Sequence, residues 1–249
     1  MTPTAMAVIA VSVLATSFLS GIFGMAGGLI LLGVLLLFMD VVPAMVLFGV
    51  IQMGANGWRA VLWRAQVEWH LIGRYLIGAT LAFLAMRFVS FLPDKALLYI
   101  GLGLLPFIAE VLPVRYQPDI TRPGGPYLCG VVIMVLQLVA GAAGHILDMF
   151  FQKSGLDRRA IVATKAVCQT FAHLFRVLYF GSFAEAFSVS IPWWAFAVAL
   201  ALAFTGTTLA ARVLERMTDA DFRIWSRRII FAVATTFLVR GVWLLVAGS

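Results

Sequence analysis

Four polar residues recur at helical spacing inside an apolar stretch of the sequence. Lys165, Gln169 and His173 stand four residues apart, and Arg176 follows three residues later. Residues at this spacing share one face of an α-helix. A lysine at bilayer depth costs about 2.5–3.5 kcal/mol, so such a face is expected to line a cavity or a substrate path. The competing interpretation is structural, with Lys165 reaching the membrane surface and the other side chains bonding neighbouring helices.

A related stripe of polar residues lies 117 positions earlier. Gln52 corresponds to Gln169, Asn56 to His173 and Arg59 to Arg176, whereas Phe48 takes the place of Lys165. Lysine, amide and imidazole groups together suit a small oxyanion, and the missing charge favours one asymmetric site lined by both stripes. Gln52 and Asn56 are also suited to bonding between helices. We expect both arginine positions to lie outside the binding set, with Arg176 near the opposite interface.

Two glycine clusters stand at the same offset of 117 residues. Glycines inside an apolar run predict broken helices, whose free N–H groups and positive dipole ends favour an anion. Discontinuous helices in equivalent positions of two halves are typical of the binding site of a transporter. Close helix packing through small residues is the alternative. The predicted substrate-adjacent glycines are Gly24, Gly27, Gly28, Gly141 and Gly144.

Three further positions, Asp148, His145 and Thr164, complete the candidate set. Asp148 has three open roles: to pair with Lys165, to bind a cation or a proton, or to cap a helix. His145 and His173 are candidates for proton coupling, because histidine changes its charge near neutral pH, although packing roles suit them too. Thr164 is a candidate donor to an oxyanion, and its hydroxyl is equally suited to bond its own backbone.

Composition defines the class of protein that must position these residues. Of 249 residues, 63% are hydrophobic and 12% are charged, and the mean hydropathy is +1.02. Soluble domains carry about a quarter charged residues, so a soluble protein is excluded. The continuous apolar runs exclude the alternating pattern of a transmembrane β-barrel. An all-α polytopic membrane protein is predicted, and its net charge of +7 is attributed to topogenic loops and not to nucleic-acid binding.

The order of apolar runs and basic loops predicts the topology. The positive-inside rule places basic loops in the cytoplasm. Basic loops follow the second, fourth, fifth and seventh segments. All four lie in the cytoplasm if the glycine-broken first and fifth segments each enter and leave the membrane on the same face. Three full crossings then remain in each half, so the chain is predicted to form two inverted repeats, 1–117 and 118–249. The expected segments are 5–38, 41–58, 71–92, 96–113, 124–151, 159–181, 190–212 and 223–247.

The glycine motifs also carry a resemblance to a known family. Gly21-x-x-Gly24-Met-Ala-Gly27-Gly28 in one half, and Gly-Ala-Ala-Gly-His-Ile-Leu-Asp148 followed by Ala163-Thr164-Lys165 in the other, resemble the sulfite exporter TauE/SafE family. The resemblance implies a permease of the bacterial inner membrane that exports sulfite, organosulfonates or related small anions. Ala26 and Ala143 depart from the triple-glycine pattern of the family, and His145 stands where glycine or proline is commoner.

These observations favour a secondary transporter of a small anion, with partners limited to that substrate and the lipid bilayer. Neither a cofactor nor a metal site is expected, and the sequence leaves open whether the protein forms a homodimer. The alternative is a transporter of cations, metals or other small solutes that uses Asp148 and the histidines. An enzyme is not expected, because the segments contain no nucleophile elbow, His-Glu-x-x-His motif or paired aspartates.

Overall fold

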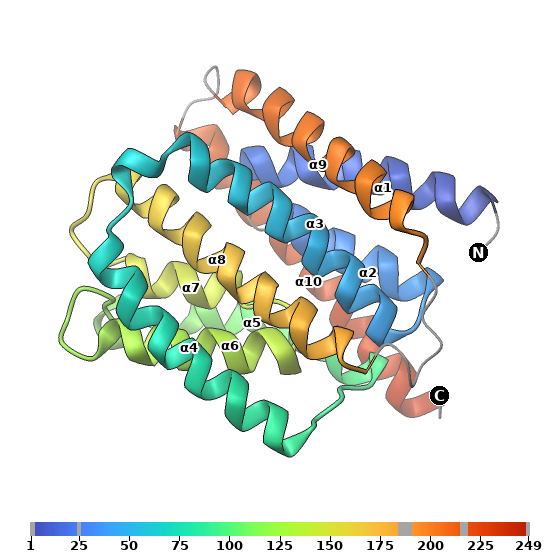
Figure 1. Cartoon of the computed structure of the whole chain (residues 1–249), viewed down its shortest axis with the longest axis horizontal. Helices are drawn as coiled ribbons and strands as arrows, with labels where there is room; N and C mark the ends of the chain where they lie inside the picture. The colour runs from blue at the N-terminus through green and yellow to red at the C-terminus, as the bar shows by residue number, and fades with distance from the viewer. Residues whose placement is uncertain (1–2, 24–25, 184–190, 215–218, 248–249) are drawn as a thin grey trace.

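The computed structural model describes residues 3–23, 26–183, 191–214 and 219–247, and these form α-helices joined by turns and two short 3-10 helices (Figure 1). The α-helices are α1 (Pro3–Phe23), α2 (Ala26–Phe38), α3 (Val41–Leu62), α4 (Trp69–Val89), α5 (Lys95–Val111), α6 (Gly125–Val139), α7 (Gly144–Phe151), α8 (Arg158–Gly181), α9 (Trp193–Leu214) and α10 (Asp219–Ala247). Each predicted segment matches one helix, except the first and fifth, which are each split in two.

Six of these helices are long and apolar enough to cross a membrane: α1, α3, α4, α8, α9 and α10. The two helices α2 and α6 are apolar but shorter, at 13 and 15 residues. Together with the absence of strands from the described residues, this confirms the predicted all-helical membrane architecture. The protein is therefore a multi-pass membrane protein.

Local sequence explains where several helices begin and end. The Asp94 carboxylate accepts from the Leu97 amide at 2.7 Å at the start of α5. The Asp157 carboxylate accepts from the Arg159 amide at 2.8 Å at the start of α8. Both are N-caps that satisfy amides with no partner inside the helix. Gly141, with φ +80°, follows α6 in a left-handed conformation that glycine adopts at little cost. The chain therefore breaks where the glycine cluster predicted a break.

The two split segments reverse direction at their breaks. In Figure 1, α1 runs from the N-terminal end towards the left and α2 turns back towards the right, whereas α6 runs to the right and α7 turns back. Helices α1 and α2 pack against each other, and α6 packs against α7. This geometry supports the re-entrant interpretation over a simple kinked crossing.

Packing between the helices follows a reciprocal pattern. The main contacts join α1 to α9, α4 to α6, α3 to α8 and α5 to α10. The five helices of the first half, α1–α5, correspond in order to α6–α10. When each helix is exchanged for its counterpart, the pair α1–α9 becomes α6–α4. The pairs α3–α8 and α5–α10 stay the same. An internal two-fold axis produces this pattern. The inverted repeats and their boundary stay a prediction, which this packing supports.

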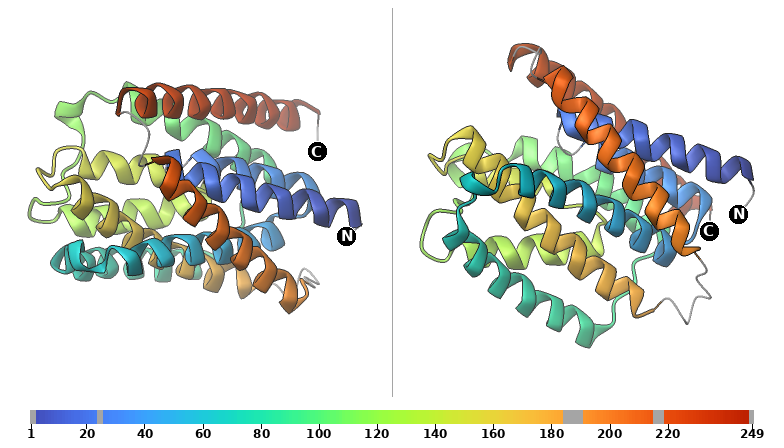
Figure 2. Two further views of the ribbon diagram at one scale, coloured as in Figure 1. Left: turned by 90° about the horizontal axis from the view of Figure 1, so that it is seen from above. Right: turned by 45° about the horizontal axis from the view of Figure 1, so that its top comes forward.

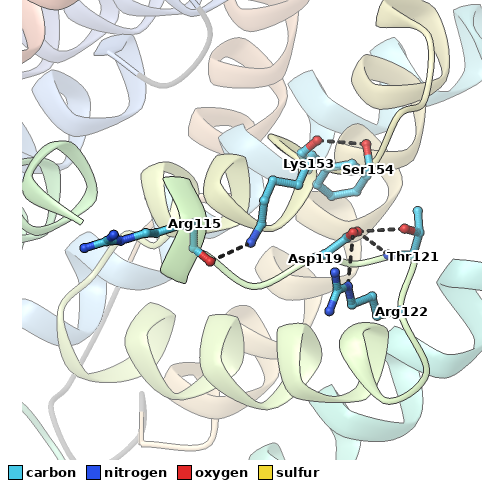
Figure 3. Close-up of polar contacts among 7 residues, drawn as sticks. Arg115, Asp119, Thr121, Arg122, Lys153 and Ser154 are labelled. Atoms are coloured by element: carbon cyan, nitrogen blue, oxygen red, sulfur yellow. Dashed lines mark hydrogen bonds and ion pairs between the residues drawn. The ribbon is translucent and has the colours of Figure 1, made fainter. Parts of the chain in front are cut away.

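Basic residues from separate connections gather at one end of the bundle. Figure 3 shows Lys153, which follows α7, donating to the Arg115 carbonyl at 3.2 Å in the connection between α5 and α6. In the same connection, Asp119 accepts from the Thr121 hydroxyl at 2.7 Å and pairs with Arg122 at 3.8 Å. These contacts hold the connection between the two predicted repeats against the end of α7.

Contacts at the opposite end of the bundle involve fewer charges. Lys95 pairs with Asp40 at 3.4 Å, and Arg87 donates to the Ser182 hydroxyl at 2.7 Å. Helix α1 begins and α10 ends on this side of the molecule, as Figures 1 and 2 show. The clustering of basic connections at the other end is the distribution that the positive-inside rule requires.

Candidate functional site

Helix α8 carries the polar stripe into the centre of the bundle, where it packs along α3 and also contacts α4, α6 and α7. Lys165 and Gln169 are partly buried, and His173 and Arg176 are buried. The stripe therefore faces protein along its whole length, as the helical spacing predicted. Gln169 has no hydrogen-bond partner among the described residues, so its amide is available to a ligand.

Lys165 pairs with Asp148 of α7 across the interface between the two helices. Of the three roles open to Asp148, the structure shows this pairing. The Lys165 and Asp148 side chains are 23% and 45% exposed, so water still reaches the pair. Arg59 of α3 lies within electrostatic range of Lys165. The lysine charge is thus neutralised by a carboxylate in this conformation, while a second cation lies nearby.

His173 is held by a glutamine that the sequence analysis did not single out. The Gln137 Nε2 of α6 donates to the His173 Nδ1 at 3.1 Å, and both side chains are buried. The Phe48 ring meets the imidazole edge-on, with ring centroids 5.5 Å apart. A glutamine inside the apolar run of α6 was the only sequence signal for this contact, because intramembrane amides usually bond neighbouring helices.

Arg176 lies in the interior of the helix bundle, enclosed by protein. Its side chain is fully buried and stacks over Phe48, with Cζ 4.8 Å from the ring centroid. Its Nη2 donates to the Gln137 carbonyl at 2.7 Å and to the Gly141 carbonyl. Its Nε and Nη1 are buried with no hydrogen-bond partner. The sequence spacing defined the face of α8 correctly but not the depth of this residue.

The two arginines of the duplicated stripes make equivalent contacts. Arg59 Nη2 donates to the Ser20 carbonyl at 3.4 Å in the last turn of α1. Arg176 Nη2 donates to the Gln137 carbonyl in the last turn of α6. Both the donors and the acceptors are separated by 117 residues. Carbonyls at a helix end lack partners within the helix, and a cation there also complements the helix dipole. Each arginine therefore caps the helix before a glycine break.

The glycines of the first break allow close packing. A Cβ at Gly28 would lie 2.6 Å from the Gln52 Nε2, and one at Gly27 would overlap the backbone and side chain of α1. Asn56 donates to the Gln52 carbonyl at 2.9 Å, within its own helix. Gly24 lies outside the described residues. At this break the geometry supports the packing interpretation and places Gln52 beside α2.

The remaining candidates lie in two places. The Thr164 hydroxyl is buried against the start of α4, where its Oγ1 accepts from the Glu68 amide at 3.0 Å. His145, just after Gly144 at the start of α7, has a buried Nε2 without a partner. His145 and Asp148 share a cavity of about 500 Å³ with Glu110 and Arg227, from α5 and α10.

The structure brings the predicted residues together in three adjoining groups and leaves Thr164 apart. Lys165, Asp148 and His145 lie around α7, and Gln52, Asn56 and Gly28 lie where α2 meets α3. A third group surrounds the second break and joins the predicted residues His173 and Gly141 to three residues that the site prediction did not include. These three are Gln137, Arg176 and Phe48.

The chain was compared with known protein families, curated proteins and solved structures. The sequence model of the protein family described as sulfite exporter TauE/SafE matches residues 8–237. No curated protein and no solved structure matches the chain.

Proposed function

The chain belongs to the sulfite exporter TauE/SafE family, and on this premise we propose that it is a secondary transporter that exports a small sulfur-containing anion across the bacterial inner membrane. Sulfite and organosulfonates are the proposed substrates. The candidate binding groups are the Lys165 charge, the polar groups of Gln52, Asn56, Gln169 and His173, and the backbone at the two glycine breaks.

The observation that carries the proposal is an excess of positive charge inside the bundle. Helices α3 and α8 contain no aspartate or glutamate, and they hold Arg59, Lys165 and Arg176 in buried or partly buried positions. Asp148 neutralises one of these three cations. Charges held at membrane depth are costly, and an interior with surplus positive charge attracts anions and repels cations. This balance favours an anion over the cation alternative.

The Lys165–Asp148 pair suggests how an anion is exchanged. A sulfite oxygen and a carboxylate oxygen are both acceptors for the Lys165 ammonium, so the substrate competes with Asp148 for this group. The displaced carboxylate is then free to take a proton, and His145 lies in the same cavity. Asp148 and His145 are therefore the proposed coupling residues at this end, and His173 is the proposed coupling residue deeper in the bundle.

The end at which the cavity lies supports export as the direction of transport. Its lining includes Arg227 and Gln152, near the basic connections that the positive-inside rule assigns to the cytoplasm. An anion entering from the cytoplasm would meet Asp148 and Lys165 first. The inside-negative membrane potential drives anions outward, so export needs no further driving ion. Rocking of one repeat against the other would then expose the site to the outer side.

Sulfite flux into sealed proteoliposomes tests this proposal. The protein variants are wild type, Lys165→Met and the matched control Lys153→Met, whose lysine bonds only the Arg115 carbonyl outside the candidate site. We expect saturable flux with wild type and with the control. With Lys165→Met, flux should fall at least about tenfold, because a charge-assisted contact to the anion is lost. A response to an imposed pH gradient would indicate proton coupling.

Two results would count against the proposal in different ways. Equal flux through Lys165→Met and Lys153→Met would show that the lysine is structural. Absence of sulfite flux with wild type would remove sulfite as substrate, and sulfonates, carboxylates and cations would be measured next. Cation flux that is lost in Asp148→Asn would establish the alternative function.

A further inference from the structure

We propose that Arg176 anchors the substrate anion at the centre of the protein, through the N–H groups of its Nε and Nη1. The inference rests on the proposed function and adds a binding residue to the candidate site. A guanidinium has five N–H donors. In Arg176, Nη2 serves the Gln137 and Gly141 carbonyls, whereas Nε and Nη1 have no partner. Three donors are therefore unused on a fully buried side chain.

The charge of Arg176 also lacks a counterion. No carboxylate of the described residues lies within 4.0 Å of its guanidinium, in contrast to the carboxylate that pairs with Lys165. A buried charge is strongly unfavourable unless it is paired and hydrogen-bonded. The two carbonyls and the Phe48 ring, 4.8 Å from Cζ, offset part of this cost. An anion would supply both the missing charge and acceptors for the unused donors.

The start of α7 adds positive potential near Arg176, beside the α6 carbonyls that this arginine caps. Gly141, whose carbonyl bonds Arg176, lies three residues before Gly144, where α7 begins. The N-cap residue of α7, Ala143, supplies no side-chain cap, so the first amides of α7 are open to another acceptor. The N-terminal end of a helix carries partial positive charge and favours anions. The unpartnered guanidinium and this helix end thus meet at the same glycine break.

Helix capping alone does not account for these contacts. Arg59 caps α1 in the equivalent way, but it is only partly buried and has no buried nitrogen without a partner. The unused donors are specific to Arg176. They lie on two nitrogen atoms, which suits an oxyanion with several oxygens, such as sulfite, a sulfonate or a carboxylate. Because Arg176 is fully enclosed, the anion reaches it when the α6–α7 hairpin separates from α8, against which both helices pack.

Anion binding by purified protein in nanodiscs tests this role. Calorimetric titration with sulfite, methanesulfonate and acetate would be applied to wild type, Arg176→Lys, Arg176→Gln and the control Arg87→Gln, whose exposed arginine bonds the Ser182 hydroxyl outside the candidate site. We expect Arg176→Lys, which keeps a cation beside the carbonyls but loses the planar donors, to bind at least about tenfold more weakly. Arg87→Gln, which removes an arginine far from the candidate site, should bind within about threefold of wild type.

The outcomes separate this inference from the proposed function. Wild-type affinity in Arg176→Lys would overturn the role of Arg176 and leave the anion transporter intact. Wild type that binds methanesulfonate or acetate but not sulfite would remove sulfite alone. No binding of any of the three anions by wild type would overturn both proposals.

A measurement on wild type covers the case in which Arg176→Gln does not fold. In protein labelled with ¹⁵N-arginine, we expect a bound anion to shift one Nε–Hε resonance that is missing in Arg176→Lys. If saturating anion leaves this resonance unmoved, the inference is wrong.

Discussion

Replacing Gly141 with alanine tests the geometry of the break between α6 and α7. Gly141 has φ +80°, a left-handed conformation that costs other L-residues about 1–2 kcal/mol. A Cβ there would lie 2.8 Å from the Leu32 Cδ2 and 3.2 Å from the Leu98 Cδ2, so these two buried side chains must shift. Overpacking of this kind costs about 1–3 kcal/mol. We expect Gly141→Ala to lower the free energy of unfolding by about 2–5 kcal/mol.

Two matched glycines separate the contributions of backbone strain and crowding. Gly155, in the connection between α7 and α8, has φ +65° and open space around a Cβ. Gly155→Ala should lose only the conformational part, about 1–2 kcal/mol. Gly73, on the exposed face of α4, has helical geometry and equally open space. Gly73→Ala should raise stability by about 0.5–1 kcal/mol, because alanine favours a helix.

Reversible unfolding by SDS in mixed micelles, followed by tryptophan fluorescence, measures these differences. The expected order of stability is Gly73→Ala, wild type, Gly155→Ala and Gly141→Ala, from highest to lowest. If Gly141→Ala unfolds no more easily than Gly155→Ala, the break is not fixed by packing against α2 and α5. The reasoning that places the Arg176 contact at a rigid break would then be refuted.

Two further predictions use the same unfolding and flux measurements. A double-mutant cycle of Lys165→Met and Asp148→Asn should give a coupling energy of about 1–2 kcal/mol. This value lies between those of exposed and buried ion pairs, because both side chains are partly exposed. A coupling energy of zero would contradict the ion pair. Gly28→Ala should change stability by less than about 1 kcal/mol, because its Cβ would meet only the flexible end of Gln52. The displaced amide should raise the KM for sulfite severalfold, and an unchanged KM would remove Gln52 from the site.

Much of the fold was predictable because it depends on local properties of the chain. Apolar runs of bilayer length defined the helices, and the predicted segment 41–58 differs from α3 only by a last turn, residues 59–62, that begins with Arg59. Glycine clusters located both breaks. The offset of 117 residues also anticipated that Arg59 and Arg176 occupy equivalent places, as their bonds to the carbonyls of α1 and α6 show.

The candidate site was predictable in composition but less so in its contacts. Helical spacing identified the face of α8, yet it carried no information on what that face meets. Gln137 escaped notice because one glutamine in an apolar run has many structural explanations. The full burial of Arg176 was not predicted, because a charge near a segment end is usually expected to reach the interface.

The sequence by itself determined the membrane class, the helices, the two breaks and the residues that share the polar face, because hydropathy and spacing act over a few turns of chain. Only the tertiary structure decided that Lys165 is neutralised by Asp148, that His173 is held by Gln137, and that the Arg176 charge has no counterion. Such pairings join helices far apart in the sequence, and their electrostatics depends on burial and distance, which arise only when the helices pack.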